Sequence, residues 1–414
     1  MKALIAAAVV GTVGALAASM PACGEELEVL HYWTSGGESK AIGVLKQDIE
    51  KQGYVWKDSA IAGGGGQNAM TVLKTRVIAG NPPNVVQMRG PVVQEWAEQG
   101  ALNNLDAVSK DWNRLLPPGI TKVLQYQGKY YVAPHWVHRA NWMYINKAAL
   151  DKVGGQVPKT HAELFALADK LKAAGYIPIA HGATPYQEGY LFEGIVQSMG
   201  IDFYRKAILE GDEATLNSPK MVEVFDIMRK MQSYFDPGIQ GRAWNLAAGM
   251  VIEGKAAILF MGDWAKGEFT AANKVPGKDF VCAVRPGTEG IFPFIADGFV
   301  FFKGKGQTGP TSGQLAMASA IMSADYQQRA ALYKGAIPAR VDVSVTAFDD
   351  CSKKSAADME AAAKSNQLLP AMVLGTTEAT IGAIRDVIGK FLNSNQDSKS
   401  AAQALAKAVK ESKS

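Results

Sequence analysis

The sequence predicts an α/β protein whose lobes are assembled from discontinuous segments of the chain. Between residues 28 and 99, short apolar strands alternate with amphipathic helices, a pattern typical of a parallel α/β layer. The region 160–231 is mainly helical, and strands return after residue 256. Strands that return so late indicate lobes built from separate stretches of chain, not beads on a string.

Length and composition fit a globular protein of two or three domains. The chain has 414 residues, 48% of them hydrophobic and 20% charged, which excludes disorder as the main state. Its 43 basic and 39 acidic residues leave a net charge of +4, with no block of Lys and Arg. Nucleic acid is therefore not expected as a partner.

The N-terminus predicts export. A basic Met1-Lys2 precedes an uncharged apolar run over 3–18, and small residues follow to Ala22, so 1–22 is interpreted as a signal peptide. The alternative, a membrane anchor, needs about 20 apolar residues. The segment Met20-Pro21-Ala22-Cys23 loosely resembles a lipoprotein box, which leaves lipidation of Cys23 as a second alternative.

The expected elements follow from apolar periodicity and from the Gly and Pro residues that end each run. Strands are expected at 28–33, 54–62, 85–88, 129–133, 141–146, 256–260, 280–284 and 298–302. Helices are expected at 38–51, 68–79, 91–99 and 161–174, through most of 160–231, and from 315 onward, where 400–413 is amphipathic.

Three cysteines are too few for a cysteine-rich scaffold or metal site. Besides Cys23, only Cys282 and Cys351 remain, and an oxidising compartment favours a disulfide between them. His135 and His138 are three residues apart, but no HExxH pattern or nearby carboxylate accompanies them, so a structural role is favoured over a metal site. No cofactor or metal is expected.

Glycine and aromatic residues mark the expected strand ends. The run 63–66 follows a strand and precedes a helix, but it lacks the spacing of a nucleotide-binding loop, which favours a loop that lets a ligand approach the backbone. Tyr32-Trp33, Trp136 and Trp264 lie beside turns and polar residues. Aromatic faces next to charged side chains suit a sugar, which stacks its C–H face and bonds through its hydroxyls. The alternative is that these rings fill the core.

Several ordered motifs then point to a family. They are His31-Tyr32-Trp33-Thr34-Ser35-Gly36-Gly37-Glu38, Val77-Ile78-Ala79-Gly80-Asn81-Pro82-Pro83, Gln94-Glu95-Trp96-Ala97, His138-Arg139-Ala140-Asn141-Trp142, Met261-Gly262-Asp263-Trp264-Ala265-Lys266-Gly267 and Lys334-Gly335-Ala336-Ile337-Pro338. Through them the chain resembles the extracytoplasmic solute-binding proteins of ABC sugar importers, and more narrowly their glucose/mannose-binding branch.

The resemblance implies a two-lobed periplasmic-binding-protein fold with a hinge that the chain crosses three times. Lobe one would comprise 24–133 and 287–310, and lobe two 134–286 and 311–414. A ligand would lie in the cleft, and the lobes would close on it.

The resemblance also implies the site. The family's stacking and hydroxyl-binding positions fall on Trp33, Glu38, Arg89, Trp264, Asp297 and Lys334, with Tyr32, Gln67, His135 and Trp136 as neighbours. Trp33 and Trp264 would sandwich a pyranose ring.

The chain departs from the glucose-binding pattern at four places. Tyr32-Trp33 stands for two Trp residues, Arg89 for Lys, Trp136-Val137-His138-Arg139 for an Asn-Ile-His-Arg stretch, and Leu374-Gly375 for a His-Gly pair that contacts sugar. Arg presents a rigid fork where Lys is a point charge. With Leu374 and Trp136 in the wall, the pocket is expected to be more apolar on one side.

The leading hypothesis is a monomeric periplasmic protein, not an enzyme, that captures a saccharide and delivers it to a membrane ABC permease. Two alternatives stay open. One is an extracytoplasmic glycosidase using Glu38 and Asp297 as paired carboxylates. The other is a binding protein that feeds a sensor.

Overall fold

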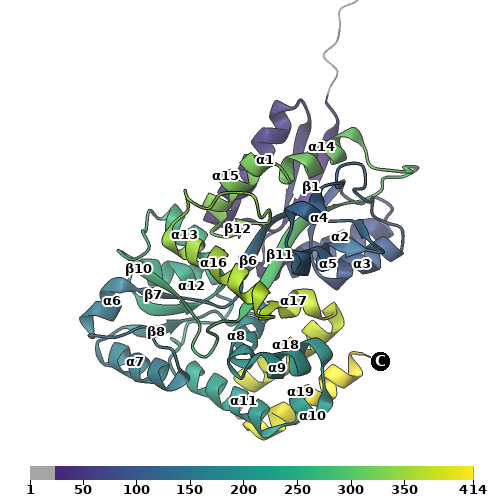
Figure 1. Ribbon diagram of the computed structural model, residues 1–414. Helices are drawn as coiled ribbons and strands as arrows, with labels where there is room; N and C mark the ends of the chain where they lie inside the picture. Colours follow the sequence, from purple (N-terminus) through teal and green to yellow (C-terminus); the bar gives the residue numbers. More distant parts are fainter. Residues whose placement is uncertain (1–23, 414) are drawn as a thin grey trace, which may run out of the picture.

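The computed structural model describes residues 24–413, which form two α/β lobes (Figure 1). The signal peptide predicted at 1–22 and the lipidation site considered at Cys23 lie outside the described residues. The predicted α/β class and two-lobed architecture are confirmed.

The first lobe is built on a seven-stranded sheet in the order β12-β6-β11-β3-β1-β2, with β13 also paired to β11. β1 pairs in parallel with β2 and with β3, as the alternating pattern predicts, whereas β6 and β11 are antiparallel to each other. The strands are β1 Glu26–His31, β2 Val55–Ala60, β3 Val85–Met88, β6 Ala133–Arg139, β11 Phe292–Phe301, β12 Ile337–Pro338 and β13 Leu368–Pro370.

Helices cover this sheet on both sides. In Figure 1, α1, α14 and α15 lie on one side of the strands, and α2, α3 and α5 lie on the other. The bounds are α1 Gly36–Lys51, the short η1 Gly64–Gly66, α2 Gln67–Ile78, α3 Pro91–Glu98, α4 Trp112–Leu115, α5 Pro118–Leu124, α14 Ser312–Ile321 and α15 Ala324–Lys334, with a small hairpin of β4 Gln125–Tyr126 and β5 Lys129–Tyr130.

The predicted lobe boundaries need correction in two places. The assignment of 311–414 to lobe two is wrong for α14 and α15, because Met317, Ile321 and Tyr326 are buried in the same core as Leu27 and Leu45. The boundary at residue 134 is also wrong, because β6 runs to Arg139 within the seven-stranded sheet. Sequence patterns identify helices, but which sheet a helix covers depends on contacts distant in the chain.

The second lobe surrounds a four-stranded sheet in the order β10-β7-β9-β8. Its core packs the aromatic rings of Phe192, Phe225 and Phe391 between α8, α11 and α18. The elements are β7 Trp142–Asn146, α6 Lys147–Lys152, α7 His161–Ala173, β8 Ile177–Ala180, α8 Pro185–Ser198, α9 Ile201–Tyr204, η2 Arg205–Glu210, α10 Glu213–Leu216, α11 Pro219–Gln232, α12 Trp244–Ile252, β9 Ala256–Phe260, α13 Ala265–Ala271, β10 Phe280–Val284, α17 Met372–Gly375, α18 Glu378–Leu392 and α19 Ser398–Glu411.

The chain crosses from the first lobe to the second after β6 and returns to the first lobe after β10. A third crossing leads from β12 to α18 and includes α16, Asp350–Lys364. A disulfide joins Cys282 in β10 to Cys351 at the start of α16, with a Cα–Cα distance of 6.1 Å, which confirms the predicted pairing. It ties the third passage to the second sheet. Within residues 24–413, no helix has both the length and the apolar character needed to cross a membrane.

Candidate functional site

A pocket of about 210 Å³ lies between the two lobes, and we call it the main pocket. One wall comes from segments that follow the carboxyl ends of β1, β2 and β3, the edge at which open α/β sheets present ligand-binding residues. Its lining residues are Tyr32, Trp33, Thr34, Ser35, Glu38, Ala62, Gly63, Gly64, Gly65, Arg89, His138, Tyr186, Ala243, Trp244, Asn245, Trp264, Ile295, Asp297 and Lys334.

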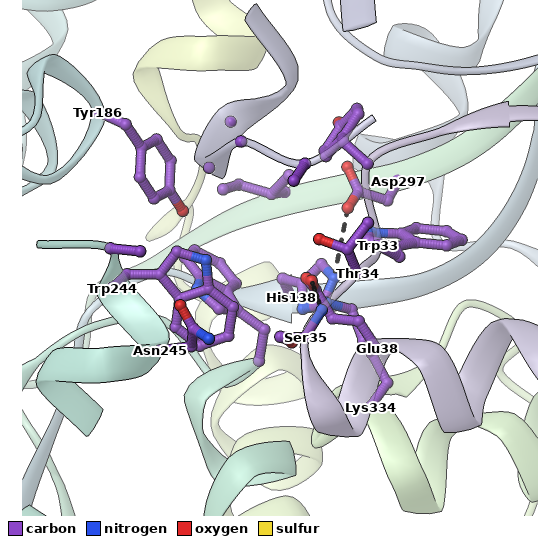
Figure 2. Close-up of a pocket in the computed structure, with 18 of the residues that line it drawn as sticks. Trp33, Thr34, Ser35, Glu38, His138, Tyr186, Trp244, Asn245, Asp297 and Lys334 are labelled. Carbon is purple, nitrogen blue, oxygen red and sulfur yellow. Dashed lines mark hydrogen bonds and ion pairs between the residues drawn. The ribbon is translucent and has the colours of Figure 1, made fainter. Parts of the chain in front are cut away.

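The opposite wall comes from the second lobe. Figure 2 shows Tyr186, Trp244 and Asn245 facing the segment from Trp33 to Glu38 across the pocket. Tyr186 lies in the first turn of α8, and Trp244 is the first residue of α12. Two helix starts therefore present aromatic rings to the strand ends of the other lobe.

The glycine loop after β2 forms part of the wall and touches the second lobe. A Cβ atom on Gly64 would lie 3.0 Å from Tyr186 Cδ1 and 3.2 Å from Trp244 Cδ1, and one on Gly65 would lie 2.7 Å from Tyr186 Cδ2. Gly65 also has a φ of +77°, which L side chains rarely adopt. The absence of side chains thus brings the backbone of this loop to the pocket wall, and the approach of a ligand to it stays a prediction.

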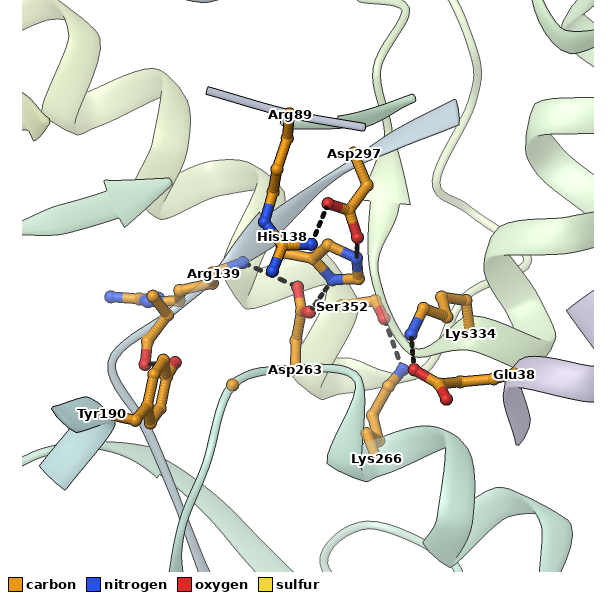
Figure 3. Close-up of polar contacts among 12 residues, drawn as sticks. Glu38, Arg89, His138, Arg139, Tyr190, Asp263, Lys266, Asp297, Lys334 and Ser352 are labelled. Carbon is orange, nitrogen blue, oxygen red and sulfur yellow. Dashed lines mark hydrogen bonds and ion pairs between the residues drawn. The ribbon is translucent and has the colours of Figure 1, made fainter. Parts of the chain in front are cut away.

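A chain of charged groups runs along one side of the pocket (Figure 3). Arg89 Nη1 donates to Asp297 Oδ1 at 2.8 Å and also to the Tyr32 hydroxyl. His138 Nε2 lies 3.5 Å from Asp297 Oδ2, while its Nδ1 bonds Asp263. Two cations and two carboxylates therefore alternate, so the chain is close to neutral when His138 is protonated.

The ionised forms of these groups are stabilised by one another. Burial by itself lowers the pKa of His138, but the Asp263 carboxylate outweighs it and raises that pKa above the usual value. Burial would raise the pKa of Asp297, yet Arg89, His138 and Lys334 hold it below its usual range. Asp297 thus remains a carboxylate that can accept hydrogen bonds but has no proton to give.

A second ion pair fixes the start of α1. Lys334 Nζ, at the end of α15, donates to Glu38 Oε1 at 2.7 Å, and the other oxygen of Glu38 accepts from the Ser35 N–H at 3.4 Å. Lys334 is 2% exposed. Both carboxylate oxygens of Glu38 therefore have protein partners, and the pair connects α1 to α15 at the pocket floor.

Most of the predicted site residues line the main pocket: Tyr32, Trp33, Glu38, Arg89, Trp264, Asp297 and Lys334. Gln67 does not; it lines a neighbouring compartment described below.

His135, Trp136 and Leu374, which were predicted to line the pocket, do not belong to its wall in the structure. His135 and Trp136 are fully buried in β6, where His135 Nδ1 lies 2.5 Å from the Tyr326 hydroxyl. Burial lowers the pKa of His135 to about 3, so this ring is neutral. Leu374, expected as an apolar wall, belongs to the first core. The aromatic and apolar character of these residues is used for packing.

Trp33 is not placed to sandwich a pyranose ring with Trp264, as the resemblance implied. Its side chain is only 1% exposed, and its ring packs against Trp136 at 4.8 Å and His135 at 5.1 Å. Trp264, by contrast, packs edge-on against His138 at 5.3 Å and borders the pocket with Trp244. The second lobe therefore supplies Tyr186, Trp244 and Trp264 to the pocket, while the first lobe supplies Tyr32 and a Trp33 that is almost wholly covered.

Sequence reasoning missed Tyr186, Trp244 and Asn245 and assigned no site role to His138. Each aromatic residue of the missed set lies at a helix start, preceded by Pro185 or by Ala243, without a strand end to mark it. The sequence does show an aromatic residue at each of these two helix starts. Aromatic residues at helix starts also pack in protein cores, so this pattern does not identify a binding site.

Comparison with known proteins identifies the family of this chain and several similar proteins. Residues 37–309 match the family model described as bacterial extracellular solute-binding protein. A probable sugar-binding periplasmic protein of Brucella melitensis is 48% identical over 94% of this chain and 93% of its own length. One of the same description from Rhizobium meliloti is 47% identical over 96% and 97%.

Among solved structures, a chitin oligosaccharide binding protein superimposes with a TM-score of 0.81. It covers 94% of this chain and 99% of its own, at 18% identity. At this identity the superposition shows a shared fold alone.

Proposed function

We propose that this chain, which belongs to the bacterial extracellular solute-binding protein family, captures a saccharide in the main pocket and delivers it to a membrane ABC importer. The close relatives are named as probable sugar-binding periplasmic proteins, which supports both the ligand class and a periplasmic location. Capture requires no reaction: the ligand stabilises the closed arrangement by binding it better than the open one.

One observation carries the proposal. Aromatic rings of Tyr186, Trp244 and Trp264 on the second lobe face paired, nearly neutral polar groups on the first. A pyranose has an apolar C–H face and a rim of hydroxyls, so it fits between a stacking surface and groups that donate and accept hydrogen bonds. Closure would complete both sets of contacts at once.

A glycosidase is disfavoured by the state of the carboxylates. Retaining and inverting glycosidases need one carboxylic acid that holds a proton for the leaving group. Asp297 has a lowered pKa, and the oxygens of Glu38 are bonded to Lys334 and the Ser35 N–H. We therefore expect bound saccharide to be recovered unchanged.

The test is titration calorimetry against a panel of neutral and acidic mono- and disaccharides, with Trp244→Ala as the variant. Losing a stacking ring from a desolvated site should cost about 2–4 kcal/mol of binding free energy. Trp96→Ala is the matched control, because Trp96 packs against Phe302 away from the pocket. Binding of no saccharide, or equal losses in the two variants, would remove the proposal. Membership of the glucose/mannose branch stays a prediction, which the same panel tests.

A further inference from the structure

A smaller space of about 70 Å³ lies beside the main pocket, and we call it the second compartment. The two share Tyr32, Gly65 and Arg89 as a common wall. Its far side includes Thr376 and Arg385 from the second lobe. A cavity needs roughly 10–15 Å³ of such volume for one water molecule, so the second compartment is large enough for a ring substituent of a few heavy atoms.

Arg385 is a buried cation without an anionic partner. It is 8% exposed, and among residues 24–413 no carboxylate lies within salt-bridge distance of its guanidinium and no hydrogen bond from it is formed. The ring of Tyr186 lies 6.0 Å from its Cζ. Burial lowers its pKa, yet an Arg side chain stays charged.

The nearby acidic groups are used elsewhere. Glu193 accepts from the Tyr204 hydroxyl at 2.8 Å and from the Met372 N–H at 2.7 Å. Glu378 also lines the second compartment, but its side chain is half exposed and lies 3.9 Å from Lys74 Nζ. By contrast, Arg89, Lys334 and His138 in the main pocket are each paired with a carboxylate. Glu193 and Glu378 do act on Arg385 through space and favour its charged form, but neither makes a hydrogen bond or salt bridge with it. Among the described cations that line the two pockets, Arg385 therefore lacks the direct carboxylate contact that Arg89, His138 and Lys334 have.

The backbone holds Arg385 in place. A Cβ atom on Gly189 of α8 would lie 3.1 Å from Arg385 Cγ and 3.2 Å from its Nε, so a larger residue there would press on the Arg385 side chain and shift it. A fixed, buried and unpaired guanidinium is costly without an acceptor, and its planar fork matches a carboxylate.

We propose that the second compartment binds the carboxylate of an acidic saccharide, a hexuronate whose ring lies in the main pocket and whose carboxylate pairs with Arg385. This rests on the proposed function and narrows its ligand class. Neutral hexoses would occupy the main pocket and leave Arg385 unpaired.

The experiment compares galacturonate and glucuronate with their methyl esters, with galactose and glucose, and with glucose 6-phosphate by calorimetry. The ester keeps the shape and removes the charge, so we expect at least one acid to bind about 10- to 100-fold tighter than its ester. Arg385→Gln should abolish that difference and leave ester affinity within about threefold, while Arg385→Lys, which keeps charge without the fork, should be intermediate. Lys390→Gln is the control, since it removes an exposed charge from the same helix.

Circular dichroism and thermal unfolding establish that each variant is folded. If each acid and its ester bind equally, or if Arg385→Gln leaves acid affinity unchanged, the inference is overturned and the saccharide-binding proposal stands. Preference for a sugar phosphate over every uronate would also overturn it, because the carboxylate would then not be the recognised group. If no saccharide binds at all, the proposed function falls with it.

Discussion

Replacing Glu38 by Gln should destabilise the first lobe, because it strands a buried ammonium group. Lys334 is 2% exposed and bonds Glu38 Oε1 at 2.7 Å. Its other close partner is the ring of Trp33, 5.7 Å from Nζ, which cannot replace a carboxylate. Breaking a buried pair by removing one partner costs about 3–5 kcal/mol. The Glu38 side chain is 11% exposed, so we expect the lower end, about 3 kcal/mol of unfolding free energy.

The double variant Glu38→Gln/Lys334→Met separates charge from packing. Once the ammonium is gone, the remaining polar group has no unpaired charge to solvate, so most of the lost stability should return. The measurement is equilibrium unfolding in urea, followed by far-ultraviolet circular dichroism and tryptophan fluorescence. Glu360→Gln is the control, since its partner Lys364 is bonded at 2.6 Å with both side chains exposed.

Two results would refute this reasoning. One is a loss in Glu38→Gln no greater than in Glu360→Gln; the other is a double variant as unstable as the single. Binding gives a further separation of roles. If Glu38 reads sugar hydroxyls directly, as the family resemblance implies, the double variant should regain stability without regaining affinity. If it acts only through its clamp on Lys334, affinity should fall no further than in Lys334→Met alone.

Three more results are expected. Replacing Cys282 and Cys351 by Ser should lower unfolding free energy by about 4 kcal/mol, from the entropy of a loop with a sequence separation of 69, measured against the reduced and oxidised parent. Burial lowers the pKa of His181 to about 3, below its unfolded value, so its stabilisation is complete above about pH 6.5 and is lost as pH falls toward 3. His181→Phe should remove about 2–3 kcal/mol of the loss at pH 4.5, and an unchanged pH profile would contradict this. Gly65→Ala should weaken saccharide binding, whereas Gly128→Ala, with a similar φ of +76° but open space, should affect stability alone.

The fold was largely predictable because its elements carry local signals. The parallel arrangement of β1, β2 and β3 follows from apolar strands alternating with helices, and the disulfide follows from there being only two suitable cysteines. β6 was missed since Pro134 and two histidines interrupt its apolar pattern; in the structure it is buried on every residue, between β11 and β12. One ring nitrogen of each histidine, Nδ1, finds a partner that only the tertiary structure brings near: Tyr326 for His135 and Asp263 for His138.

The site residues, too, were predictable only where a local pattern marks them. Residues that follow β1 and β3, such as Trp33, Glu38 and Arg89, were identifiable because the end of a parallel strand is itself a positional signal. Trp136 and Trp244 carry the same kind of side chain, yet the first is 0% exposed in β6 and the second borders the pocket. What distinguishes them is the packing around each ring: Trp136 lies within the core of the first lobe, whereas Trp244 lies at a helix start that borders the pocket between the lobes. Arg385 makes the point most clearly: its unpaired state is a property of α8, α18 and the first lobe together, and no local pattern around residue 385 reports it.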